Sequence, residues 1–185
     1  MAAATDQQLM ELSQRGDAAA FAEIVTRWQA PVARLVAQLL GPRIDVEDLC
    51  QEVFVRVLRA RDRYRPSHAF STWMYRIALN VARDFRRRQA RRPQTCTASQ
   101  DLPAPALPAI EALARNEEER AVAAALAALP DDLREILVLK HFGHLSAVDI
   151  GLVMNLPPST VKSRLQAALK RLRGELLRRG LSHSE

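Results

Sequence analysis

The chain has 185 residues, a length that suits one medium-sized domain or two small ones. Nearly half of the residues (48%) are hydrophobic, yet no apolar run approaches the roughly 20 residues of a membrane span. The N-terminus lacks the basic start and apolar run of a signal peptide, so we expect a soluble, cytoplasmic protein without direct membrane insertion. The net charge of +6 favours a polyanionic partner.

The positive charge is concentrated in one stretch. Twelve arginines lie between Arg56 and Arg92, against only two acidic residues, Asp62 and Asp84. Arginine makes bidentate contacts with phosphate and guanine that lysine makes less well. The stretch therefore predicts nucleic-acid binding, and a solvated basic helix face is the alternative.

Motifs for other chemistry are missing. Cys50 and Cys96 are too few for a disulfide framework, and nothing near His141 and His144 completes a metal-ligand set. The sequence also lacks a Gly-rich phosphate loop, a nucleophile elbow and a paired-carboxylate motif. We therefore expect no catalytic residue, no metal and no cofactor.

Apolar residues recur at helical spacing throughout, which predicts an all-α fold. A short helix is expected at residues 6–14. Asp17 then caps a second helix, which Pro31 kinks or splits and Gly41 ends. Asp45 caps a third helix, whose expected buried stripe is Val46, Leu49, Cys50, Val53, Phe54, Val57 and Leu58.

The exposed face of this third helix begins acidic and ends basic. Its acidic part holds Glu47, Asp48, Gln51 and Glu52. The helix dipole alone can explain this order, because it favours acids in the first turn and bases in the last. An acidic patch beside a basic segment would also suit a basic partner protein.

A loop at residues 62–71 leads into a helix that continues to about residue 88, and Ser71 or a neighbour is expected to cap it. One face of this helix is apolar, and Trp73 belongs to it. The other face carries Arg76, Asn80, Arg83, Arg86 and Arg87. Arginines with amide and aromatic groups nearby suit a polyanion with unstacked bases.

From Pro93 to Ala109 the sequence has four prolines and no helical period, which predicts an extended or disordered linker. The following helix stops at Pro130, Asp131 caps the next one, and Ser146 caps a short helix. A longer basic helix follows Pro157-Pro158, so the order predicts a helix-turn-helix.

Angular positions divide this last helix into two faces. The expected buried side is Val161, Leu165, Ala168, Leu169 and Leu172. Small polar residues lie opposite and cations flank them, which suits base reading between phosphate contacts. A plain amphipathic helix in a bundle is the alternative.

Three segments, DVEDLCQEVFVRVLRA, FSTWMYRIALNVARDFRRR and LPPSTVKSRLQAALKRLR, resemble the signature segments of bacterial extracytoplasmic-function (ECF) sigma factors of the sigma-70 family. The resemblance implies two small helical domains joined by a flexible linker at residues 93–115. Sigma region 2 would occupy residues 5–92, and the sigma region 4 helix-turn-helix would occupy residues 116–180.

The resemblance also implies partners and residue roles. The chain would bind core RNA polymerase, direct promoter-specific initiation and promote strand opening. An anti-sigma factor would regulate it, for which a membrane anchor is one option. Docking on the clamp of the largest polymerase subunit is implied for Asp48, Gln51 and Glu52, all expected to be exposed. Minus-ten DNA binding is implied for Tyr64, His68, Phe70, Arg76, Asn80, Arg83, Arg86 and Arg87. Minus-thirty-five binding is implied for Ser159, Thr160, Lys162, Ser163, Arg164, Gln166 and Lys170.

The chain departs from the family pattern in the short helix before the turn. At residues 147–151 the family usually has an acidic pair followed by Ile-Ala, which this chain lacks. Gly151 is expected to weaken that helix by about 1 kcal/mol relative to alanine.

Two alternatives for the function remain open. An autonomous helix-turn-helix regulator would bind duplex DNA tightly without polymerase, whereas an enzyme or structural adaptor lacks any site constellation.

Overall fold

The structure is a computed structural model that describes residues 4–41, 44–91 and 117–179, with side chains from residue 120 onward in the third range. Within these ranges the fold is all-α, as the sequence predicts, with eight α-helices and one 3-10 turn at Arg61–Arg63. The expected linker at residues 93–115 lies outside the described residues. The helices are α1 (Asp6–Gln14), α2 (Ala18–Leu40), α3 (Val46–Ala60), α4 (Phe70–Arg91), α5 (Glu117–Ala127), α6 (Asp131–His141), α7 (Ala147–Met154) and α8 (Pro158–Arg178).

Capping side chains set where the first helices begin. Thr5 forms a capping box with Gln8, and Asp17 and Asp45 accept hydrogen bonds from the backbone of α2 and α3. Gly41 ends α2 with a φ of 88°, which glycine adopts without strain. Pro31 lies inside α2, which continues through it, so of the two expected effects, a kink or a split, the split is wrong. Ser71 is not the cap of α4 either, because that helix already begins at Phe70.

Helices α1 to α4 form a first module around one apolar core. Ile24, Leu35 and Leu39 of α2 are fully buried, as are Met74 and Leu79 of α4. Five aromatic rings from α2, the loop before α4 and α4 itself meet edge to face or tilted, with centroid separations of 5.0–5.8 Å: Trp28, Tyr64, Phe70, Trp73 and Tyr75. This cluster attaches the loop before α4 to the rest of the module.

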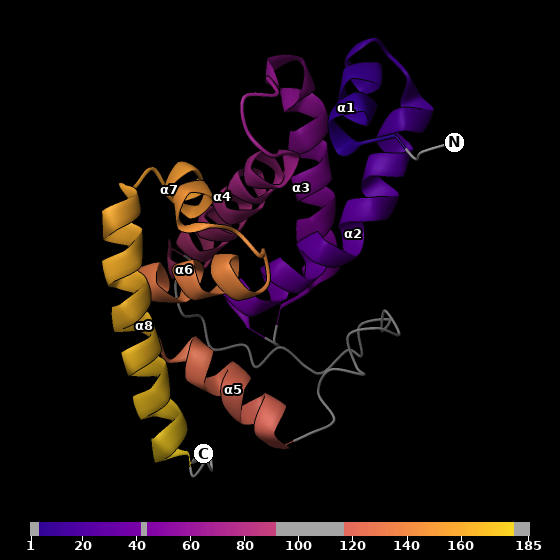
Figure 1. Cartoon of the computed structure of the whole chain (residues 1–185). Coiled ribbons are helices and arrows are strands. Elements are labelled where there is room, and N and C mark those ends of the chain that lie inside the picture. The colour runs from indigo at the N-terminus through magenta and orange to yellow at the C-terminus, as the bar shows by residue number, and fades with distance from the viewer. Residues whose placement is uncertain (1–3, 42–43, 92–116, 180–185) are drawn as a thin grey trace.

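Helices α5 to α8 form a second module, which contains the predicted helix-turn-helix. Ser146 and Asp149 form a capping box at the start of α7, and Asn155 ends α7 in the left-handed conformation. Pro157 and Pro158 begin α8, where proline needs no backbone N–H. Pro130, and not Asp131, occupies the N-cap position of α6. Figure 1 shows α7 and α8 side by side at the turn, with α5 beside the C-terminal half of α8.

A close backbone approach favours glycine at residue 151, although helix propensity alone predicts that Gly151 weakens α7. A Cβ atom at residue 151 would lie 2.6 Å from the carbonyl oxygen of Leu156. The backbone N–H of Leu156 also donates a 2.9 Å hydrogen bond to the Gly151 carbonyl. The chain therefore returns so closely over α7 that only glycine fits there.

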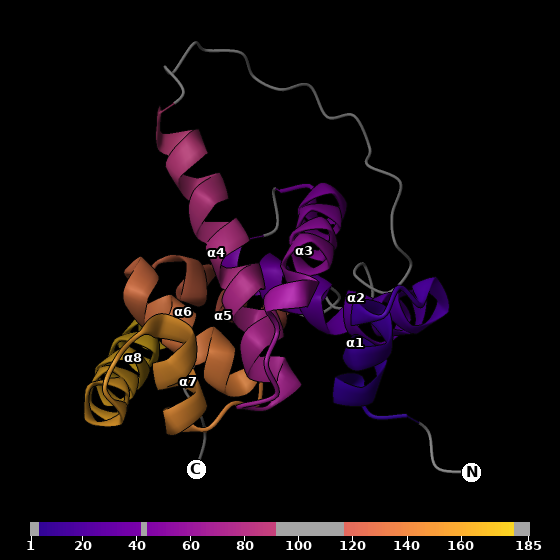
Figure 2. The same cartoon turned by 90° about the horizontal axis from the view of Figure 1, so that it is seen from above.

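The two modules pack against each other. Buried residues of α6 and α7, among them Ile136, Leu139 and Ile150, belong to the same apolar cluster as the core of the first module. Helix α4 contacts α3 on one side and α7 on the other, and α2 contacts α6. In Figure 2, α4 lies between α3 and the helices of the second module. Part of the face of α4 that carries its arginines therefore lies at the boundary between the modules.

Replacing Gly151 by alanine tests the turn. Helix propensity alone would stabilise Gly151→Ala by about 1 kcal/mol, whereas the contact with Leu156 predicts a loss of about 1–3 kcal/mol. Gly174→Ala is the matched control, because a Cβ atom at this position in α8 would meet nothing within 4 Å. Urea unfolding should show Gly151→Ala less stable than the wild type and Gly174→Ala at least as stable. A stabilised Gly151→Ala variant would contradict the close approach.

Candidate functional site

The outer face of α3 combines polar and apolar exposed residues. Asp48 and Gln51 are exposed, as the sequence predicts. Val55 and Leu58 continue the same face at helical spacing and are 43% and 39% exposed. Sequence reasoning missed Val55 and placed Leu58 in the buried stripe, although the i, i+3, i+4 spacing from Asp48 and Gln51 could have identified both. The face offers an apolar patch bordered by acid and amide groups.

Glu52 is only half-buried and paired, so the expectation that it is freely exposed is wrong. It forms an ion pair with Arg56 one turn along α3 and a 3.0 Å ion pair with Arg88 of α4. Burial alone would raise the pKa of Glu52, but hydrogen bonds from Arg88 and Arg56 outweigh it and hold the pKa below its ordinary value. Glu52 therefore connects α3 to α4.

Asp84 forms a second connection between these helices. Its Oδ2 accepts a 2.7 Å hydrogen bond from Nη1 of Arg56, and its other oxygen pairs with Arg87. The hydrogen bonds from Arg56 and Arg87 lower the pKa of Asp84. Arg56 is thus neutralised by Glu52 and Asp84, whereas Arg59 in the last turn of α3 is exposed.

The ring side chains expected to contact DNA differ in how far they are buried. Tyr64 and Phe70 are 2% and 4% exposed, because both rings belong to the aromatic cluster. Both rings therefore have almost no exposed surface in this structure, and their contact with DNA stays a prediction. Gln14 holds the loop by donating to the backbone carbonyls of Arg61 and Tyr64 at 2.7 and 3.2 Å. His68 remains exposed.

The polar face of α4 is divided in the same way. Asn80 and Arg87 are exposed. Arg83 and Arg86 instead pair with Glu135 of α6, whose side chain is only 3% exposed. Arg76 donates to the Leu152 carbonyl and to the Asn155 side chain in the second module. Three of the arginines expected to hold phosphate therefore hold the second module.

The predicted reading face of α8 is largely exposed. Ser159, Lys162, Ser163, Gln166 and Lys170 all lie on the surface, and Thr160 is half-buried. Arg164 is also half-buried, with its Nη1 3.5 Å from Oδ2 of Asp132. Leu169 is 44% exposed, so its place in the expected buried stripe is wrong. Among the residues of that stripe, Val161 and Ala168 are the fully buried ones.

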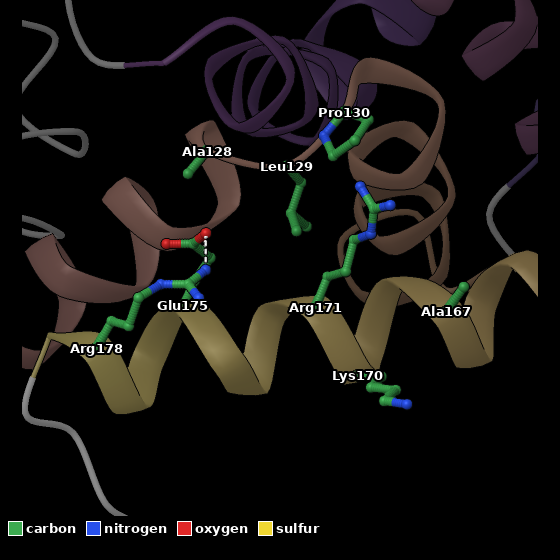
Figure 3. A pocket seen from close by; sticks show the side chains of 8 residues that line it. All are labelled: Ala128, Leu129, Pro130, Ala167, Lys170, Arg171, Glu175 and Arg178. Atoms are coloured by element: carbon green, nitrogen blue, oxygen red, sulfur yellow. Dashed lines mark hydrogen bonds and ion pairs between the residues drawn. The ribbon is translucent and has the colours of Figure 1, made fainter.

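A groove lies between α8 and the corner that joins α5 to α6. Ala128, Leu129 and Pro130 form the corner side, and Ala167, Lys170, Arg171, Glu175 and Arg178 form the α8 side. In Figure 3, Arg171 reaches toward Pro130, whereas Lys170 points away from the corner and Glu175 binds Arg178. The basic surface of α8 therefore extends along the helix from the predicted reading face.

The residues that the structure describes show no metal centre, since no three or more His, Cys, Asp or Glu residues gather there. Burial raises the pKa of the Cys50 thiol to about 11, so this thiol stays protonated and poorly nucleophilic at neutral pH. None of the described helices combines the length and the apolar character that a membrane crossing requires.

Comparison with known proteins finds matches in both modules. The model of Sigma-70 region 2 matches residues 24–92, and the model of Sigma-70, region 4 matches residues 119–172. The ECF RNA polymerase sigma-E factor of Escherichia coli K12 is 39% identical over 174 residues, covering 87% of this chain and 88% of the relative. The RNA polymerase sigma-H factor of Pseudomonas aeruginosa is 35% identical over 173 residues, covering 86% and 88%.

Two solved structures share the arrangement of helices. CnrH, solved in complex with the cytosolic domain of CnrY, is 27% identical and superposes with a TM-score of 0.71, covering 92% of this chain and 96% of that one. The sigma factor RpoE of Bartonella quintana, solved with the anti-sigma factor NepR, has a TM-score of 0.68 at 19% identity, covering 84% and 96%. The second likeness shows the fold alone.

Acid should weaken the connection between α3 and α4. Both carboxylates have folded-state pKa values below the ordinary values of 4.5 for Glu52 and 3.8 for Asp84. Their contribution to stability is therefore present above these ordinary values and lost as the pH falls through the lower folded-state values. Urea unfolding should show Asp84→Asn less stable than the wild type at neutral pH, with the difference shrinking as the pH falls below 3.8. A difference that stays constant over this range would contradict the ion-pair role.

Proposed function

The chain belongs to the sigma-70 family, among its ECF members, and on that premise we propose that it binds core RNA polymerase, selects a promoter and helps to open the DNA. One observation supports this proposal most strongly. The chain exposes an acidic and apolar face on α3, which suits a protein partner, and a polar and basic face on α8, which suits DNA, and it also carries the arginine-rich helix α4. We assign core and minus-ten binding to residues 5–92, a linker to 93–115, and minus-thirty-five binding to 116–180. In this role the chain has no catalytic activity of its own and acts in the cytoplasm.

We assign core polymerase docking to the outer face of α3. Asp48 and Gln51 supply acid and amide groups, and Val55 and Leu58 supply apolar contact beside them. An apolar centre with a polar, charged rim is the usual composition of a protein interface. Glu52 contributes through its place at the edge of this face, but its ion pairs also hold α4 in position. The partner is the clamp of the largest polymerase subunit.

We assign minus-ten recognition to the loop before α4 and to the exposed part of α4. Extracting a base from the duplex costs a few kcal/mol of unstacking, which a pocket with hydrogen-bonding and stacking groups offsets. His68 and Asn80 are exposed and available for such a pocket. Tyr64 and Phe70 support it from within the core. Arg87 can bind phosphate as α4 stands, whereas Arg76, Arg83 and Arg86 require the second module to move.

We assign minus-thirty-five recognition to the exposed face of α8. Helix α8 follows α7 through a tight turn, the arrangement in which a recognition helix enters the major groove. Ser159, Ser163 and Gln166 can contact base edges, while Lys162 and Lys170 contact phosphates on either side. Thr160 lies at the N-terminal end of the helix. Arg164 can also contact DNA once its ion pair with Asp132 is broken.

We further propose regulation by an anti-sigma factor that masks these surfaces. Support comes from the solved CnrH structure, which is 27% identical to this chain and holds the cytosolic domain of a second protein. The promoter-binding groups are also distributed over two modules, so a partner that holds both modules can cover them together. Such a partner can be soluble or attached to a membrane.

In vitro transcription tests the proposed function. Purified core RNA polymerase should produce a promoter-specific transcript with this chain and none without it, on a template library of promoters from the source genome. A different initiation factor that is active with the same core preparation is the control for the enzyme. Absence of any specific transcript, combined with tight binding of duplex DNA by the chain alone, would favour an autonomous regulator instead.

Gln51→Arg tests the docking face. A cation at this position opposes a basic partner and adds bulk to the centre of the face, so binding to core polymerase should weaken by about tenfold, or ~1.4 kcal/mol. The matched control is Gln29→Arg, the same change at an exposed position of α2. Fluorescence anisotropy of the labelled chain with core polymerase measures both variants. Equal loss in the two would mean that net charge, and not the α3 face, determines binding.

A further inference from the structure

A carboxylate is buried between the two modules. Glu135 lies in the second turn of α6, and its side chain is 3% exposed. Its Oε2 accepts a 2.7 Å hydrogen bond from Nη2 of Arg83, and Nε of Arg83 lies 3.2 Å from both of its oxygens. Arg86 donates to its Oε1. Glu135 is thus held by two arginines of α4, 49 and 52 residues away in the sequence.

Ordinary helix electrostatics do not account for this position. Asp131 begins α6, where the helix dipole favours an acid, but Glu135 has left the first turn. A carboxylate with so little exposure costs several kcal/mol to desolvate unless it is paired and hydrogen-bonded. Asp131 lies one turn earlier on the same face and forms a 2.6 Å ion pair with Nη1 of Arg86. The second module therefore presents two acids to the basic face of α4.

The contact continues along α4 toward its N-terminus. Arg76 donates to the carbonyl of Leu152 and lies 3.3 Å from the Asn155 side chain. Thr72 donates to Asp149 of α7 at 3.4 Å. At Gly143, a Cβ atom would lie 3.3 Å from the Tyr75 ring, so the backbone of the second module approaches α4 closely. The second module thus contacts α4 at several points between Thr72 and Arg86, while Asn80 between them stays exposed.

We infer that Glu135 and Asp131 act as an internal substitute for DNA phosphate, so that the second module masks the minus-ten face of α4 in the free chain. This inference rests on the function proposed above. The guanidinium groups of Arg83 and Arg86 direct their donors at carboxylates, and a phosphate needs the same donors. DNA and the second module therefore compete for α4. The chain binds the minus-ten strand fully only after α6 and α7 have moved away.

Masking has a measurable consequence for affinity. A chain whose binding-competent form is a minor fraction binds its ligand more weakly by that fraction. Removing the carboxylate charge of Glu135 should increase the fraction of chains in which the second module has moved away from α4. The average size of the chain and its affinity for single-stranded DNA should therefore increase at the same time. An effect of net charge alone would tighten binding without expanding the chain.

Two measurements on the full chain test the inference. Small-angle X-ray scattering reports the radius of gyration, and anisotropy of a short fluorescein-labelled single-stranded DNA of mixed sequence reports affinity. Glu135→Gln should increase the radius of gyration and tighten DNA binding by at least about fivefold. Asp131→Asn, at a more exposed position, should do the same to a smaller extent. Glu11→Gln on α1, an exposed site with the same charge change, is the control and should leave both quantities nearly unchanged.

The outcomes separate this inference from the proposed function. Unchanged radius and affinity in both Glu135→Gln and Asp131→Asn, with helix content retained by circular dichroism, would overturn the mask. Expansion without tighter DNA binding would overturn the competition with DNA. If the wild type directs promoter-specific transcription while both variants behave like the wild type in these measurements, only the mask fails and the sigma-factor function stands.

Discussion

Helix α4 must bury an apolar stripe and at the same time carry six arginines, and the rest of the structure follows from this constraint. Its apolar side, including Met74, Ala78 and Leu79, completes the core of the first module. Its arginines lie too close to that core for all of them to remain freely hydrated. Carboxylates therefore pair with them: Glu52 of α3 and Asp84 of α4 itself on one side, and Glu135 and Asp131 of α6 on the other.

These ion pairs give the same residues two roles. A guanidinium that neutralises a carboxylate in the free chain can bind phosphate once that carboxylate withdraws, because both acceptors suit the same planar donors. Isolated surface pairs contribute at most about 1 kcal/mol and exchange easily. The pairs at Glu135 are different, since breaking one would leave a buried charge without compensation. Release of α4 is therefore expected to involve movement of the whole second module.

Particular residues show how far a sequence carries a prediction. Local signals identified the caps at Asp17, Asp45 and Ser146 and the helix end at Gly41, because each depends on a few neighbouring backbone groups. Gly151 was misjudged, because helix propensity could not reveal the returning carbonyl of Leu156. The burial of Tyr64 and Phe70 was missed too, since aromatic residues in a polar loop resemble an exposed surface until the rings that cover them are known.

The sequence by itself determined the all-α class, the order of the helices, the helix-turn-helix and the family, because periodicity, capping and motif spacing are properties of neighbouring residues. Only the tertiary structure decided which charged residues are free. Glu135 looks like an ordinary solvent-exposed glutamate of α6, and Arg83 and Arg86 look like open phosphate ligands. These paired residues are 49 and 52 positions apart in the sequence. Such a contact depends on how the modules pack, and a pattern among neighbouring residues does not predict it.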